Sequence, residues 1–97
     1  MYVTIAAHHP KGPNEESQLL DAMRKFGEEQ RRQKGLIIVT AGRDELGGFI
    51  FALAIWDSKE NFLAARSEVA KALVRVNFDA LEDIPHKLYM GEPSVWV

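Results

Sequence analysis

The chain contains no cysteine among its 97 residues. This absence excludes disulfides, thiolate-bound zinc, iron–sulfur clusters and thiol nucleophiles. The longest apolar run, Phe49 to Trp56, is too short to span a bilayer, and no signal-peptide pattern precedes Tyr2. A net charge of −2 also lacks the basic excess of nucleic-acid binders. We therefore expect a cytoplasmic protein with one domain over residues 1–97 that binds neither membrane nor nucleic acid.

Strand patterns occur in four places along the chain. Segments rich in β-branched and other apolar residues predict strands over residues 2–9, 36–41, 49–56 and 86–90. Residues 77–85 are expected to form an irregular connection with one short turn near residues 79–82. Residues 94–97 are expected to form an extended tail.

Two segments between these strands have helical spacing of apolar residues. The first predicted helix begins at Asn14 as N-cap and stops at Gly35. The second begins at Asp57 or Ser58 and ends between residues 73 and 76. The order strand, helix, strand, strand, helix, strand predicts an α+β, ferredoxin-like βαββαβ fold with an antiparallel sheet.

The third predicted strand indicates that the chain forms an oligomer. All eight residues from Phe49 to Trp56 are apolar, so both faces of the sheet need burial, and two helices cover only one. We expect a homodimer in which two copies pack through the open sheet face. The alternative is that the 77–85 connection or the tail covers that face within one chain.

The segment from Gly35 to Phe62 resembles the antibiotic biosynthesis monooxygenase (ABM) domain. A glycine ends the first helix, a hairpin follows, and an apolar strand closes on Trp56-Asp57-Ser58 before the next helix. The resemblance implies a dimeric α/β barrel with a pocket between sheet and helices. It also implies a cofactor-independent monooxygenase that uses O2 on an aromatic, phenolic or quinol-type small molecule. The alternative is a non-catalytic dimeric barrel that binds a small apolar ligand.

Three residues are candidates for substrate binding. The resemblance places Trp56 at the pocket, where its indole can stack on a flat substrate and its N–H can hold an oxygen. It is otherwise a core residue that ends a buried strand. Arg66 on the second helix can hold a phenolate oxygen, or can extend into solvent. Asn77 is a weaker polar candidate, with a helix-ending role as its alternative.

His8 and His9 are the candidates for a general base, together with Trp56 as a catalytic residue. Neighbouring residues of a strand point to opposite faces, so only one of the two histidines can face the pocket, and the pair cannot bind one metal ion. The alternative is that both are surface residues, and His86 is expected to be structural. Haem-degrading relatives need a histidine on the second helix, and residues 59–76 contain none. We therefore expect no metal, haem or other cofactor.

Overall fold

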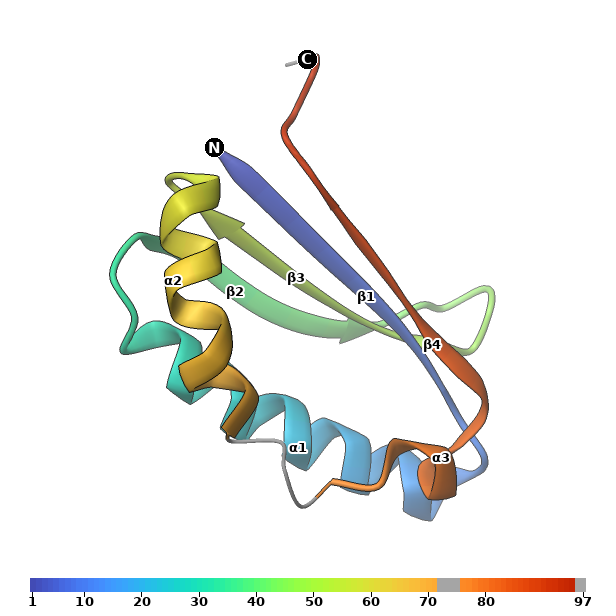
Figure 1. Ribbon diagram of the computed structural model, residues 1–97. Coiled ribbons are helices and arrows are strands. Elements are labelled where there is room, and N and C mark those ends of the chain that lie inside the picture. The colour runs from blue at the N-terminus through green and yellow to red at the C-terminus, as the bar shows by residue number, and fades with distance from the viewer. Residues whose placement is uncertain (72–75, 96–97) are drawn as a thin grey trace.

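The computed structural model describes residues 1–71 and 76–95. Its elements are β1 (Tyr2–Pro10), α1 (Pro13–Arg31), β2 (Leu36–Arg43), β3 (Ile50–Trp56), α2 (Lys59–Ala70), α3 (Phe78–Leu81) and β4 (Glu82–Gly91). The strands form one antiparallel sheet in the order β2-β3-β1-β4, and α1 and α2 lie on the same side of it (Figure 1). The predicted ferredoxin-like α+β fold is confirmed.

The sheet has an inner face under the helices and an outer face without them. β1 runs antiparallel to β3 with Tyr2 opposite Trp56 and His8 opposite Ile50. Residues directly opposite one another point to the same face of a sheet, so these four residues share the inner face. Tyr2 and Trp56 pack there against α2 in the main hydrophobic cluster, with Ala54, Ala65 and Val69.

The outer face carries large apolar side chains that stay exposed. Ile5 of β1 lies opposite Leu53 of β3 and Tyr89 of β4, so one apolar row crosses three strands. Ile5 is 39% exposed, Tyr89 55% and Ile38 of β2 47%. No described helix covers this row.

The predicted ends of the first helix were wrong. The helix begins one residue before Asn14, and Gly12 is an N-cap without a side-chain hydrogen bond. Pro13 at the first helical position accounts for this start, because its fixed φ is already helical. The C-cap is Arg32, so Gly35 lies beyond the helix end, although its φ of +91° is the conformation that favours glycine.

In the second half of the chain, α2 begins after Ser58, one of the two N-caps predicted for it, and ends earlier than predicted. Ser58 is the N-cap of α2, with its hydroxyl oxygen accepting a hydrogen bond from the Asn61 N–H at 3.1 Å. The C-cap is Lys71, earlier than expected, and residues 73–75 lie outside the described residues. The predicted short turn is α3, and residues 96–97 of the predicted tail are also not described.

β4 begins at Glu82, four residues before the predicted start. The prediction failed because Pro85 reads as a strand breaker, whereas β4 is an edge strand, where proline is tolerated. Among the described residues, no helix is long and apolar enough to cross a membrane.

Candidate active site

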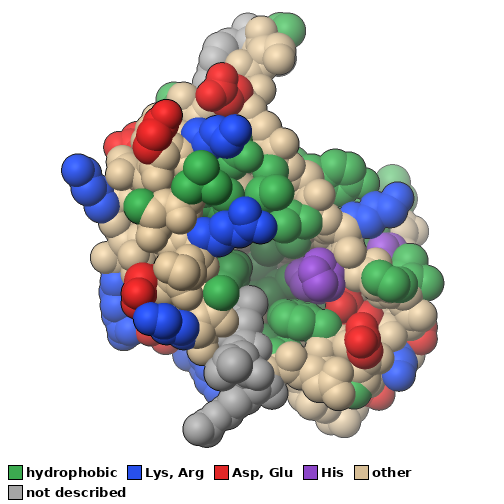
Figure 2. Space-filling model, viewed as in Figure 1, with side chains coloured by type: hydrophobic (Ala, Val, Ile, Leu, Met, Phe, Trp, Pro, Cys, Tyr) green, Lys and Arg blue, Asp and Glu red, His purple; other side chains and the backbone are tan. Residues whose placement is uncertain are grey.

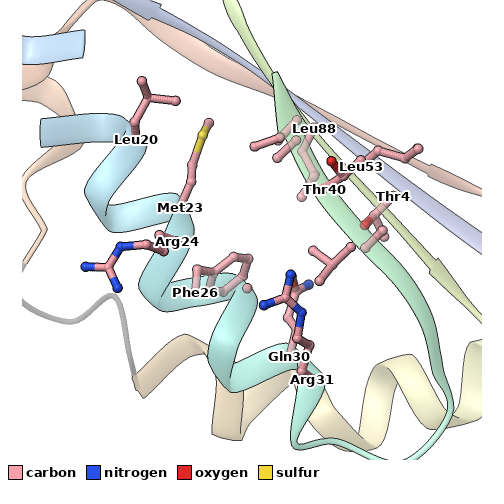
Figure 3. A pocket seen from close by; sticks show the side chains of 16 residues that line it. Thr4, Leu20, Met23, Arg24, Phe26, Gln30, Arg31, Thr40, Leu53 and Leu88 are labelled. Atoms are coloured by element: carbon pink, nitrogen blue, oxygen red, sulfur yellow. The ribbon is translucent and has the colours of Figure 1, made fainter. Parts of the chain in front are cut away.

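The inner face of the sheet is hollowed between α1, α2 and the strands. Two adjoining cavities of about 210 and 190 Å³ share Thr4, Phe26, Gln30 and Leu88 in their linings. In Figure 3, Met23 of α1 and Leu88 point toward one another across the first of them. Figure 2 shows hydrophobic side chains gathered around a hollow on this face, with Lys or Arg side chains near it. A concave apolar site with a few polar groups is typical of small-molecule binding.

Trp56 forms one wall of the smaller cavity. The register places it between Leu36 and Tyr2, and its ring meets Phe62 of α2 edge to face at 5.9 Å. The side chain is 1% exposed, and its Nε1 has no hydrogen-bond partner among the described residues. A buried N–H without a partner costs about 1–3 kcal/mol, so a ligand oxygen at Nε1 would be stabilising.

Arg66 of α2 lines the same cavity as Trp56. Arg66 is exposed and forms no ion pair within the described part of the chain. Thr4 and Gln30, both buried, add polar atoms to the lining. Two of the residues predicted from the sequence, Trp56 and Arg66, are thus brought to one cavity that has an aromatic wall and a cation.

His8 lies at the other end of β1, on the same inner face. It is four residues beyond Thr4, about 13 Å along the strand. Its Nδ1 is 2.9 Å from Oε1 of Glu82, and both side chains are buried. Burial lowers the pKa of His8 more than the neighbouring Glu82 carboxylate raises it, which favours the neutral imidazole. His8 is not among the described residues that line either cavity beside α1.

His9 and Asn77 also lie away from Trp56. The ring of His9 packs against Phe49, at 5.6 Å between centroids, while the His8 ring packs against Phe78 and His86. The two neighbouring histidines therefore have different surroundings, as strand alternation predicts. Asn77 is the N-cap of α3 and lines a separate cavity between α1 and α3. It begins a helix, where the sequence suggested that it ends one.

Glu82 is the polar residue that sequence reasoning missed. It was assigned to an irregular connection, but it begins β4 and its carboxylate is buried against His8 and the His9 amide. These residues are more than 70 positions apart. A local pattern carries no signal for such a pair, and only the β1–β4 register brings the residues together.

The fold and the hollow define a ferredoxin-like domain with a largely apolar cavity under its helices. No family model and no curated protein sequence matches the chain. Solved structures do match, and they include ABM proteins, so the predicted resemblance is confirmed as a shared fold.

Three of these structures cover almost the whole chain. Rv0793 from Mycobacterium tuberculosis is 17% identical with a TM-score of 0.79, over 95% of this chain and 93% of its own. An antibiotic biosynthesis monooxygenase is 17% identical with a TM-score of 0.76, over 96% and 98%. The monooxygenase ActVA-Orf6 of Streptomyces coelicolor, solved with the ligand nanaomycin D, is 18% identical with a TM-score of 0.76, over 99% and 89%.

Proposed function

We propose that the chain is a monooxygenase that binds a small aromatic, phenolic or quinol-type molecule in the hollow beside Trp56. The observation that carries this proposal is that Trp56 lines a largely apolar cavity while its buried Nε1–H has no partner among the described residues. A flat substrate with an oxygen substituent satisfies both features, because its ring packs on the indole and its oxygen accepts the N–H.

Arg66 gives this cavity its charge preference. A guanidinium without an ion-pair partner in the described chain favours the anionic form of a phenol or quinol. The anion passes electrons to O2. One oxygen atom enters the ring and the other leaves as water, so a quinol and O2 give a hydroxyquinone and water. Because the substrate supplies every electron, the proposed reaction needs no external reductant or organic cofactor.

The position of His8 argues against its role as the base that removes the substrate proton. His8 lies about 13 Å beyond Thr4 along β1 and outside the described cavity lining, which is too far for direct contact with a ring beside Trp56. His9 packs against Phe49 instead. We therefore propose that Arg66 stabilises the substrate anion and that neither histidine removes the substrate proton.

The likeness to other proteins supports the same class of reaction. One solved structure of this fold is named an antibiotic biosynthesis monooxygenase, and another is a monooxygenase in complex with nanaomycin D. At 17–18% identity these neighbours share the fold with this chain. The proposal therefore depends on the cavity residues.

A homodimer is part of the proposal. The outer apolar row through Ile5, Leu53 and Tyr89 crosses three strands, and no described helix covers it. Burying large side chains of this kind is worth about 1.5–3 kcal/mol each, so a second sheet packed on this face is favourable. Light scattering at micromolar concentration should give the dimer mass, and a monomer mass across that range would contradict it.

Oxygen consumption with a panel of quinols and phenols tests the reaction, and fluorescence quenching tests binding. The quenching is measured in a Trp96→Phe variant, in which Trp56 is the only tryptophan. Trp56→Phe in the full chain should weaken binding about fivefold, the scale of one hydrogen bond of about 1 kcal/mol, measured by calorimetry. The control is Leu46→Ala, a change in the β2–β3 loop at a side chain that is 99% exposed.

Two results would contradict the proposal in different ways. Binding without oxygen consumption across the panel would favour the non-catalytic barrel that binds an apolar ligand. Binding that is unchanged in Trp56→Phe would remove the cavity assignment itself.

A further inference from the structure

Three side chains with metal-binding groups converge where β1 meets the start of β4. The Glu82 carboxylate lies between two imidazoles, with Oε1 2.9 Å from His8 Nδ1 and Oε2 3.6 Å from His86 Nδ1. One ligating atom from each residue lies within 4.8 Å of the other two. The set is two histidines and one carboxylate, a combination that binds divalent transition-metal ions in many proteins.

The charge of Glu82 is poorly compensated by its protein neighbours. Its side chain is 2% exposed, and within residues 1–71 and 76–95 no Lys or Arg forms an ion pair with it. The His9 amide donates a hydrogen bond to Oε1 at 3.2 Å. A buried carboxylate is costly without a paired charge, and a cation beside it removes that cost.

The spacing of the three groups fits a small ion. Two ligands bound tetrahedrally to zinc are about 3.4 Å apart, since each is about 2.1 Å from the metal. The observed 2.9 and 3.6 Å, which run to the two different oxygens of Glu82, fall on either side of this value. One ligating atom from each residue lies within 4.8 Å of the other two, so the groups must draw together to bind one ion. The His86 side chain is 44% exposed, which leaves a path for the ion and room for a water ligand.

The backbone and a neighbouring ring hold the cluster in place. The β1–β4 register shifts between Ala7 and His9, and such a bulge re-aims the side chain within it, here His8. Phe78 of α3 packs on both imidazoles, at 5.5 Å from His8 and 5.4 Å from His86 between ring centroids. The two rings are therefore restricted in orientation before any ion binds.

We propose that His8, Glu82 and His86 form a binding site for one divalent transition-metal ion of the zinc class, with at least one position left to water. The sequence-based expectation of no metal considered His8 with His9, which have different surroundings, and overlooked the two ligands from β4. His8 is six residues, about 20 Å along β1, from Tyr2, which lies opposite Trp56, so the metal site is away from the proposed oxygenation at Trp56.

Cobalt(II) is the probe for this site, because a bound ion gives visible absorption bands and occupies zinc sites. Tag-free full-length protein is treated with a chelator, desalted and titrated with CoCl2. We expect saturation at one equivalent per chain and displacement by ZnCl2. His86→Ala, at the exposed ligand, should weaken Co²⁺ binding at least tenfold, and Glu82→Gln, which keeps the shape of the side chain, should do the same.

His9→Ala is the matched control, because it removes a neighbouring imidazole whose ring packs on Phe49. Its Co²⁺ affinity should equal that of the wild type, and circular dichroism should show that all variants are folded. No saturable Co²⁺ binding by the wild type, or equal affinity in His86→Ala, would overturn the proposal and leave a hydrogen-bonded structural cluster. Neither result changes quinol binding or oxygen consumption, which test the other site.

Discussion

The two ends of the inner face differ in how their polar atoms are satisfied. At one end Trp56 has a buried N–H without a partner in the described chain, beside a cavity. At the other end both carboxylate oxygens of buried Glu82 are within 3.6 Å of a nitrogen atom of His8, His9 or His86. This difference underlies the two proposals: a ligand that brings an oxygen at the first end, and a cation at the second.

One strand connects these ends. Residues 2, 4, 6 and 8 of β1 alternate with the outer-face residues, so a single period-two pattern places Tyr2 in the hydrophobic cluster, Thr4 and Ala6 in the cavity lining and His8 beside Glu82. Tyr2 and His8 are about 20 Å apart along β1, so the proposed oxygenation site and the proposed metal site are separated by the length of the strand. A change at either end should therefore leave the other unaffected.

The largest expected effect is on turnover, which should fall when the Trp56 end is changed and stay nearly the same when the His8 end is changed. Arg66→Ala should lower kcat/KM for a quinol about 100-fold, or about 2.7 kcal/mol, because the substrate anion loses its cation. Arg66→Lys should retain part of the activity, since it keeps the charge but loses the planar fork. Oxygen-electrode rates on folded variants measure both.

His8→Gln is the corresponding change at the far end, and its amide can still donate to Glu82. We expect a change in turnover of less than about threefold. A loss of about 100-fold, the size of a general-base contribution, would instead make His8 the base and would contradict the separation of the two ends.

The sequence predicted the elements of the Trp56 end because their signal is local. Strand and helix periodicity placed Trp56 at the end of a strand and Arg66 on the helix after it, as the structure has them, while the family resemblance suggested the pocket. The His8 end was missed because Glu82 and His86 become neighbours of His8 only through β-sheet register. Pro85 between them also suggested a break in the strand.

The polar residues of that motif have structural roles. The Ser58 hydroxyl accepts from the Asn61 N–H, and an Asp57 carboxylate oxygen accepts from Asn61 Nδ2 at 2.8 Å. The Asp57 N–H donates to the Gly35 carbonyl at 2.8 Å. The polar residues of the motif therefore build the junction after Trp56, and the proposed chemistry depends on Trp56 within the motif and on Arg66 outside it.

Gly35→Ala should destabilise the Trp56 end by about 1–3 kcal/mol, the cost of a non-glycine residue at a left-handed φ. The new Cβ would also lie 2.5 Å from Asp57 Oδ1 and 2.7 Å from the Asn61 side chain. Urea denaturation measures the loss. Gly91→Ala is the control, because its Cβ would meet nothing within 4 Å, and equal stabilities of the two variants would contradict this account.

The smallest expected effect concerns the pKa of Asp57, which a hydrogen bond from Asn61 holds below its ordinary value of 3.8. Because the folded pKa is the lower one, this carboxylate stabilises the fold above the unfolded pKa, and the contribution disappears as pH falls through the folded pKa. Asn61→Ala should raise the pKa of Asp57 toward 3.8, measured by NMR titration of its carboxyl carbon. Asp21 on α1, whose pKa is lowered by a hydrogen bond from Arg24, is the control, and its titration should stay the same in the variant. An unchanged Asp57 titration would show that Asn61 does not hold the carboxylate, and the junction after Trp56 would then depend on Ser58 and Gly35 alone.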